Sequence, residues 1–392
     1  MKFENFQLRF KSETLSETII PFISISFTIL SLLYSGVFWS SIFFYLLIIF
    51  FLVFYQKDFS NLKIKSFITI FLILTTFLAS NNDLMSLSPF TKDYFSFLMI
   101  HQNFWIYTIK IILVLFLTSI ITTSFDRNFR VVSDLFFTSL LIGIFIFNSY
   151  FESGRFTFDM GFGRYLPNWT AAYLYIFLIF CVRCNFYFSF SICLTFGFLT
   201  VSRNFFLAIL IVIIGYTILP LLKKYIFRST YLLIISYLFI TLFCLLILEH
   251  ITLGNLSSIN LIGHRISEFS PDTPRLLWNL QGLDSWVSSI NNLVWGYGNW
   301  PDDGPNPHNA LLHSLLEHGL IPTSLIIFLI FSALSEDSEG VEPWIIGFFV
   351  LSSFLHLTFF GMFWILLIFV TKIRMDYYGF FNLLGNFDFK KK

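Results

Sequence analysis

The sequence predicts an all-α fold, a polytopic membrane bundle of about 12 transmembrane helices with one large loop on the outer side. Of its 392 residues, 56% are hydrophobic and only 12% are charged, whereas a soluble domain carries about 25% charged residues. The apolar residues gather in runs that approach the roughly 20 residues needed to cross a bilayer as a helix. The Lys and Arg residues between these runs are distributed unequally, as the positive-inside rule leads us to expect of a membrane protein.

The apolar runs define the predicted helices in order. Single runs occupy residues 19–34, 37–55, 66–79, 104–121, 131–148, 169–182, 186–201, 204–219, 231–248 and 309–333. The last stretch, residues 344–372, is too long for one span, and we interpret it as two short helices that turn near residues 356–361. Several runs are short for a bilayer, so we expect flanking residues to complete these spans.

The charge distribution indicates that the N-terminus lies inside. The leading segment, MKFENFQLRFKSETLSET, is polar and has no small-residue cleavage site after its first apolar run, so we expect it to precede a retained helix. In this orientation 17 of the 24 basic residues face the cytoplasm, 6 face outward, and Lys110 lies within a span. The outward-facing basic residues are Lys92, Arg155, Arg164, Arg203, Arg265 and Arg275.

Three segments follow from this topology: N-terminal spans in residues 1–248, an outer loop in residues 249–307, and C-terminal spans with a cytoplasmic tail in residues 308–392. A loop of this length in a compact protein is usually functional or disordered. Four of the nine Trp residues lie in it, which argues against disorder. The net charge of +1 gives no indication of nucleic-acid binding, and the four Cys residues, in or beside apolar runs, are expected to be packing residues.

The outer loop contains a predicted amphipathic helix, PRLLWNLQGLDSWVSSINNLVW, which begins at Pro274 after a Thr273 cap and ends before Gly296. Its apolar residues recur with a helical period, so we expect the helix to lie on the membrane or on the helix bundle. These residues are Leu276, Leu280, Leu283, Val287, Ile290 and Val294. Trp278 and the other Trp residues of the loop are either interfacial anchors or surfaces on which sugars stack.

Arg275 stands in the first turn of this helix, where the positive end of the helix dipole disfavours a cation. An anion bound by the free backbone N–H groups and the guanidinium together would explain its position. A solvated arginine is the alternative.

The next segment, PNPHNALLHSLLEHG, carries a cluster of titratable residues. We expect Asn306 to cap a helix and Pro307 to be its first residue, which puts His308 in the first turn. The positive helix end disfavours the imidazolium, so His308 would be able to accept a proton, as a general base must.

Asn309, His313 and Glu317 follow at four-residue steps and form one polar stripe. Because an unpaired carboxylate within a membrane is costly, we expect Glu317 to pair with a cation from another helix, with Arg203 as the candidate. A zinc site that joins these residues to the neighbouring His residues is the rival interpretation. Only His313 and Glu317 have i, i+4 spacing, and no H-E-x-x-H motif or Cys cluster accompanies them, so we predict no metal and no cofactor.

These segments together resemble the O-antigen ligase and O-antigen polymerase superfamily of bacterial membrane glycosyltransferases. HNALLHSLLEHG is similar to the His-Asn, nine residues, Gly signature of that family. PRLLW…WGYG is similar to its Arg-x-x-Trp helix and following Gly-x-Gly, and SRNFF to its Ser-Arg at the outer end of a middle span. The motifs occur in the expected order over residues 200–320, and the rest of the chain matches only as a many-span bundle. The segment GLIPTS lacks the Thr-Asp that many ligases have after the Gly.

The resemblance implies a C-type, mostly helical glycosyltransferase fold in the bacterial inner membrane, with the active site facing the periplasm. The donor would be a glycan on a polyprenyl diphosphate, undecaprenyl diphosphate in most bacteria. The acceptor would be a sugar hydroxyl of the lipid A core or of another glycan. By motif position, His308 would be the base, and Arg203 and Arg275 would hold the diphosphate in place of a divalent metal. The further substrate-binding candidates are Arg265, Asn309, Glu317 and Trp278.

A transporter or flippase for the same lipid-linked glycan is the alternative from another class. It accounts for the spans and the outward-facing arginines. It does not account for a long loop that presents His308, and transporters usually bind near the bilayer midplane between broken helices. Formation of a longer glycan or a glycolipid would distinguish transfer from movement alone.

Overall fold

The computed structural model of the chain describes residues 68, 71–72, 123–125, 130–152, 155–158, 167–253, 274–297, 307–355 and 362–375. These residues are mostly helical, which confirms the all-α prediction at that level. Within them, no single helix has both the length and the apolar character needed to cross a membrane. One pair of helices, Arg203–Thr217 with Leu219–Ile226, meets both conditions when taken together across a bend of 82°. The predicted runs at 19–34, 37–55 and 104–121, and nearly all of 66–79, lie outside the described residues.

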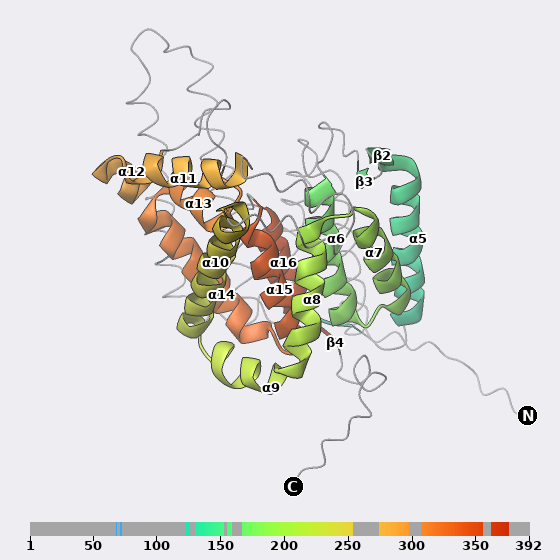
Figure 1. Cartoon of the computed structure of the whole chain (residues 1–392). Helices are drawn as coiled ribbons and strands as arrows, with labels where there is room; N and C mark the ends of the chain where they lie inside the picture. Colours follow the sequence, from blue (N-terminus) through green and yellow to red (C-terminus); the bar gives the residue numbers. More distant parts are fainter. Residues whose placement is uncertain are drawn as a thin grey trace, which may run out of the picture. The chain divides into compact units, whose positions relative to one another are not determined.

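The chain divides into two compact units. The described helices of the first unit are α5 (Arg130–Asn148), α6 (Pro167–Cys184) and α7 (Tyr187–Leu199). Those of the second unit are α8 (Arg203–Thr217), α9 (Leu219–Leu221), the π-helix η2 (Leu222–Ile226), α10 (Thr230–Leu253), α11 (Pro274–Val287), α12 (Ile290–Trp295), α13 (Ala310–His318), α14 (Leu320–Asp337), α15 (Glu342–Ser353) and most of α16 (Met362–Lys372) (Figure 1). All four Cys residues of the chain are free and buried, in agreement with their predicted packing role.

A buried carboxylate joins α5 to α7 in the first unit. Asp134 on α5 is 3% exposed and accepts the backbone N–H groups of Phe188 (3.0 Å) and Ser189 (2.9 Å). It also accepts the Ser189 hydroxyl at 2.7 Å. The first N–H groups of a helix have no partner within it, and the helix dipole favours an anion at that end. Asp134 therefore completes the start of α7 from a neighbouring helix.

Short strands accompany these helices, although the apolar pattern predicted only helices. The pairs are β1 (Thr123–Phe125) with β4 (Ile373–Met375), which are parallel, and β2 (Ser149–Glu152) with β3 (Arg155–Phe158), which are antiparallel. Arg155 donates from Nε to the Thr200 carbonyl (3.0 Å) and from Nη2 to Asn168 Oδ1 (3.1 Å). The two arms of one guanidinium therefore link β3 to the start of α6 and the end of α7.

The second unit is built around α8 and α15, which pack side by side and run in opposite directions. Gly215 allows this packing, because a Cβ there would lie 2.8 Å from the Cβ of Pro343. Trp344 Nε1 donates to the Tyr216 hydroxyl at 2.7 Å. The last turn of α8 thus lies beside the first turn of α15. Arg203, at the opposite end of α8, lies toward the end of α15.

Aromatic side chains fill the interior of the second unit between α10, α14, α15 and α16. Tyr237 packs edge-on against Phe331 and Phe349, with ring centroids 5.3 and 5.1 Å apart. Trp364 packs edge-on against Phe348 at 5.0 Å, and all five of these side chains are fully buried. The opposite face of α10 is apolar and exposed. It carries Ile235, Leu238, Phe239, Leu242, Phe243 and Leu246.

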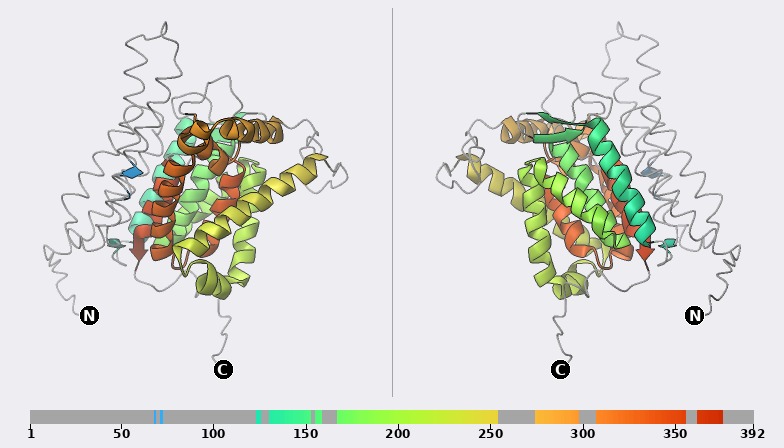
Figure 2. Two further views of the ribbon diagram at one scale, coloured as in Figure 1. Left: turned by 90° about the vertical axis from the view of Figure 1, so that its left-hand side faces the viewer. Right: turned by 90° about the vertical axis from the view of Figure 1, so that its right-hand side faces the viewer.

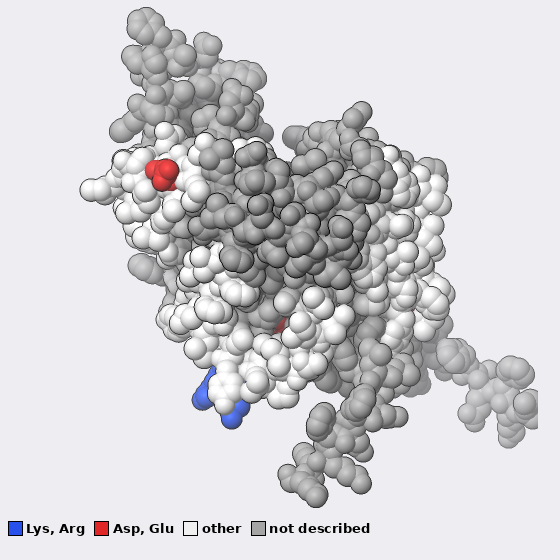
Figure 3. Space-filling model, in the orientation of Figure 1, with Lys and Arg blue, Asp and Glu red and all other residues white. Residues whose placement is uncertain are grey.

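The short helices α9 and η2 form a turn that joins α8 to α10 (Figures 1 and 2). Lys223, Lys224 and Arg228 are exposed there, and Figure 3 shows basic side chains gathered over this turn. Lys223 Nζ lies 3.9 Å from a carboxylate oxygen of Glu342, which is 3% exposed at the first position of α15. Burial raises the pKa of the Glu342 carboxyl, although Lys223 and nearby backbone N–H groups act in the opposite direction.

Two helices that were predicted to be continuous are each divided. The helix predicted from Pro274 to Trp295 breaks into α11 and α12, because the Ser289 side chain accepts the Asn292 N–H (3.0 Å) and caps a new helix. The span predicted at 309–333 breaks into α13 and α14 at Gly319, whose φ is +75°. Pro322 follows in the first turn of α14, where its missing N–H needs no partner. The last stretch forms two helices, α15 and α16, as predicted.

Candidate functional site

The two predicted motif segments of the outer side meet at Trp278 and His308. The indole of Trp278, on α11, stacks on the imidazole of His308 with ring centroids 5.3 Å apart and an interplanar angle of 28°. Both side chains are half-buried. Gly282, one turn after Trp278, allows the close approach, because a Cβ there would lie 2.6 Å from Pro307 Cγ. The stack therefore depends on a residue without a side chain on α11.

His308 does not lie in the first turn of a helix, which corrects the prediction. Asn309 is the N-cap of α13, and its Oδ1 accepts the Leu312 N–H at 3.0 Å. Its Nδ2 donates to the Ser353 carbonyl at the end of α15 (3.1 Å). The expected cap at Asn306 is thus wrong, because the fully buried Asn309 both caps α13 and fastens it to α15. His308 precedes the cap and lies outside the helix, where its imidazole stacks on Trp278.

Two glycines join the end of α12 to the end of α13. Gly296 and Gly319 have φ values of +81° and +75°, a region that residues with a Cβ rarely adopt. A Cβ on Gly296 would overlap the Glu317 carbonyl and the Gly319 nitrogen, and a Cβ on Gly319 would overlap the Gly296 nitrogen. Tyr297 N–H donates to the Leu316 carbonyl at 2.6 Å. The first glycine of WGYG and the glycine that ends the His-Asn, nine residues, Gly signature are therefore in contact through their backbones.

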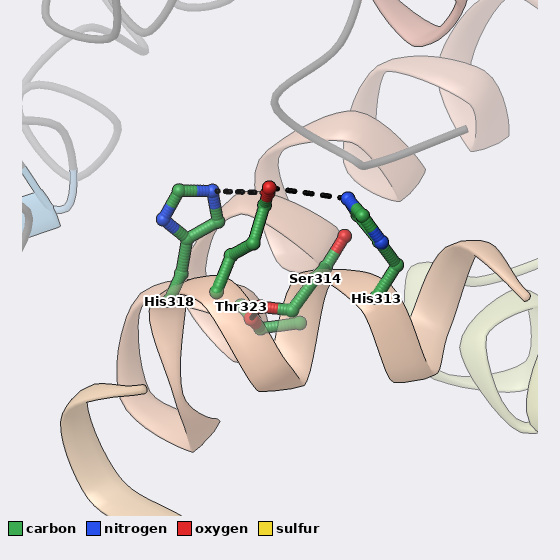
Figure 4. Close-up of polar contacts among 5 residues, drawn as sticks. His313, Ser314, His318 and Thr323 are labelled. Carbon is green, nitrogen blue, oxygen red and sulfur yellow. Dashed lines mark hydrogen bonds and ion pairs between the residues drawn. The ribbon is translucent and has the colours of Figure 1, made fainter. Parts of the chain in front are cut away.

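Glu317 on α13 pairs with the imidazoles of His313 and His318, whose contacts with the carboxylate between them are the dashed lines of Figure 4. Its Oε1 is 3.1 Å from His313 Nε2, and its Oε2 is 3.4 Å from His318 Nε2. The predicted polar stripe is present, but the predicted pairing of Glu317 with Arg203 is wrong. The carboxylate instead lies against two imidazoles of its own helix, one turn before it and one residue after it, and each of them carries a positive charge only when protonated.

The rival zinc site is not assembled in the part of the chain that the structure describes. The rival interpretation joins the imidazole of His308 to the Glu317 cluster, whereas that ring stacks on Trp278. Among the described residues, no three His, Cys, Asp or Glu side chains are arranged to hold a metal ion.

Asn279, the neighbour of Trp278, was not singled out by the sequence. It is 4% exposed, whereas Asp284, Ser288 and Asn291, which are also polar residues of the predicted helix, are exposed. Neither its Nδ2 nor its Oδ1 has a hydrogen-bond partner among the described residues. Leaving a buried polar group unbonded costs about 1–3 kcal/mol. The sequence signal for its burial is Gly282, three residues later on the same helix face, because a glycine there allows the close approach of Pro307.

The apolar stripe of α11 and α12 faces away from the rest of the second unit. Leu280, Leu283, Val287 and Ile290 are 51%, 41%, 52% and 82% exposed. The two helices lie across the end of the unit where α10 finishes and α14 begins (Figures 1 and 2). The stripe therefore does not pack on the helix bundle, because it is the opposite face, with Trp278 and Asn279, that packs on α13.

The structure describes the three predicted arginines to different extents. Arg203 is exposed at the first residue of α8, toward the end of α15 where Ser353 meets Asn309. The backbone of Arg275 lies in the first turn of α11, one turn before Trp278, and its side chain lies outside the described residues. Arg265 lies outside them altogether. The starts of α8, α11 and α13 are thus at one end of the second unit, and the arginine clamp stays a prediction.

Comparisons with protein-family models, with curated proteins and with solved structures found no match to this chain.

Proposed function

We propose that the chain is a membrane glycosyltransferase of the O-antigen ligase or polymerase kind. It moves a glycan from a polyprenyl diphosphate to a sugar hydroxyl at the periplasmic face of the bacterial inner membrane. The observation that carries the proposal is the stack of Trp278 on His308. It joins the Arg-x-x-Trp helix to the His-Asn signature, which are two of the three motifs that predict this activity. The contact between Gly296 and Gly319 adds the glycines of the same motifs.

The two ends of the second unit support a membrane position. The exposed basic residues Lys223, Lys224 and Arg228 lie where α10 begins, and α11 crosses the region where α10 ends. Cytoplasmic ends of membrane helices are enriched in Lys and Arg. The exposed apolar faces of α10 and of α11 and α12 would then be covered by lipid chains and by the outer interface, respectively. These parts belong to the proposed polytopic bundle of about 12 transmembrane helices.

The chemistry follows from the predicted roles of the residues. His308 takes the proton of the acceptor hydroxyl as its oxygen bonds to the anomeric carbon of the donor glycan. The bond from that carbon to the phosphate oxygen breaks, and its electron pair leaves with the polyprenyl diphosphate. Arg203 and Arg275 neutralise the departing diphosphate through paired N–H groups, so this step needs neither a cofactor nor a divalent metal.

A transfer assay on the purified full chain in lipid nanodiscs tests the proposal. With a polyprenyl-diphosphate-linked oligosaccharide as donor, we expect a longer glycan or a glycolipid. His308→Ala should lower its rate by about 10²- to 10⁴-fold, the usual loss on removal of a general base. Trp278→Phe, which keeps an aromatic ring on the imidazole, should retain most of the activity. Added EDTA should leave the rate unchanged.

Other outcomes would contradict the proposal in identifiable ways. Near-normal transfer by His308→Ala would show that His308 is not the general base. Inhibition by EDTA that a single metal reverses would support the zinc site instead. Passage of the lipid-linked glycan across the bilayer without a new product would indicate a flippase. The glycan profile of a deletion strain then separates the two transferases, since single-repeat chains indicate a lost polymerase and long unattached chains a lost ligase.

A further inference from the structure

The buried face of α11 carries one feature that the proposed mechanism leaves unused. Asn279 is 4% exposed, and neither polar atom of its amide is hydrogen-bonded within the described part of the chain. A buried amide without partners opposes folding. An apolar residue of similar size would remove this cost, so the amide has a role that the described protein atoms do not fulfil.

The surroundings of Asn279 indicate the chemistry of the missing partner. The preceding residue, Trp278, presents one face to the imidazole of His308 and is itself only half-buried. An aromatic ring provides an apolar surface on which the C–H face of a sugar ring can pack. An Asn amide provides two N–H donors and an acceptor oxygen, which match hydroxyl groups that both donate and accept. Trp278 and Asn279 together therefore provide an apolar surface and an amide of the kind that bind one pyranose ring.

We propose that Trp278 and Asn279 form the subsite for the sugar ring of the acceptor. This inference rests on the proposed function, because it assigns the acceptor of that reaction to one face of α11. A sugar bound there lies beside His308, the ring on which Trp278 stacks. One of its hydroxyl groups would then be within reach of the imidazole, as proton transfer to a general base requires. Binding of the sugar would supply the hydrogen bonds that the Asn279 amide lacks.

The binding test uses methyl glycosides of glucose, galactose, N-acetylglucosamine and rhamnose as probes, with the purified full chain in nanodiscs. Saturation-transfer NMR should show contact with at least one of them in the wild type. Asn279→Leu should abolish that signal and unfold at the same temperature as the wild type or higher. Gln281→Leu, which removes an amide from the exposed face of the same helix, should change neither result. Equal signals from Asn279→Leu and the wild type, or no signal for any glycoside, would overturn the subsite.

The kinetic test separates this inference from the proposed function. With saturating donor, Asn279→Leu should raise the acceptor KM by about tenfold or more and leave the donor KM unchanged. Transfer with an unchanged acceptor KM in Asn279→Leu would overturn the subsite while the transferase stands. Glycoside binding that depends on Asn279, without any glycan transfer by the wild type, would overturn the transferase while the sugar site stands.

Discussion

Gly296 and Gly319 lie back to back, and neither position has room for a Cβ. Each glycine has a positive φ, and each follows the last residue of a helix, α12 and α13 respectively. The contact holds the end of α12 against the end of α13, directly before α14 begins. The same segment carries Trp278 toward His308, so the geometry of the proposed site depends on this backbone contact.

The first prediction is that Gly296→Ala and Gly319→Ala are both strongly destabilising. With ψ near 180°, both glycines occupy a backbone region that is essentially confined to glycine, where a residue with a Cβ costs about 1–3 kcal/mol, and overlap with the facing backbone adds to that. Thermal unfolding of the purified protein measures the effect. Gly143→Ala is the control, because a Cβ at that position on α5 meets nothing within 4 Å. It should stabilise the helix by about 0.5–1 kcal/mol. Equal unfolding temperatures for all three variants would contradict the role of the contact.

The second prediction concerns the diphosphate. If Arg203 and Arg275 each grip phosphate oxygens with paired N–H groups, Lys keeps the charge but loses the paired geometry. Arg275→Lys should then be nearly as inactive as Arg275→Ala in the transfer assay, and Arg203 should behave likewise.

The control for these arginines is Arg228→Lys, which should retain full activity. Arg228 is exposed on the basic turn and has no hydrogen-bond or ion-pair partner in the described ranges. Arg155 is unsuitable as a control, because both arms of its guanidinium are bonded. The contrary result is that Lys restores activity at both Arg203 and Arg275 and that added salt lowers this activity. It would contradict the clamp and indicate that the two positive charges only attract the anionic lipid, because salt screens exposed charges.

The third prediction is that Asp134→Ala destabilises the first unit. The substitution removes the acceptor of two N–H groups, that of Phe188 in a partly buried place and that of Ser189 in a buried one. Hydrogen bonds to a charged group are worth about 1.5–3 kcal/mol, and Asp134→Asn should cost less because one acceptor oxygen remains. Ser139→Ala, on the same helix but exposed, should stay within about 0.5 kcal/mol of the wild type. A chemical denaturation series compares the three, and identical midpoints would show that Asp134 does not support α7.

The fourth prediction is a pH dependence that originates at Glu342. Its pKa is raised in the folded chain, so the folded state binds this proton more tightly than the unfolded state. The stabilisation from this proton is complete below the usual Glu pKa of about 4.3 and is lost as the pH rises through the raised pKa. Glu342→Gln should remove that part of the pH profile of the unfolding temperature. A profile identical to that of the wild type would show that the carboxyl is not protonated preferentially in the fold.

The sequence predicted the helices well where an apolar run coincided with one helix. The predicted run at 204–219 and α8 agree within two residues, and α10 begins one residue before its predicted run. The two divided helices were missed for a local reason. A Ser side chain at position 289 can cap a helix as well as lie within one, and hydrophobic periodicity continues across the break.

The contacts of the candidate site were only partly predictable from the sequence. The i, i+4 spacing of His313 and Glu317 indicated a shared face, and the structure has that pair. The cap could not be chosen from sequence, because Asn306 and Asn309 have equal capping ability. The carbonyl of Ser353 that favours Asn309 comes from a distant part of the chain. Because polar residues are mostly exposed, the burial of Asn279 is established by the tertiary packing and not by the sequence alone.

The burial of Cys181, Cys184, Cys193 and Cys244 leaves the folded chain without a thiol that a reagent in solution can reach. A single cysteine introduced at an exposed position would therefore carry the label alone, with every native cysteine kept. Leu280 on α11 and Tyr225 in the basic turn are two such positions. With a maleimide that cannot cross lipid, added to intact cells, the first should react and the second should not. The wild-type protein should therefore remain unlabelled, and any label on a variant reports which side of the membrane its introduced cysteine faces.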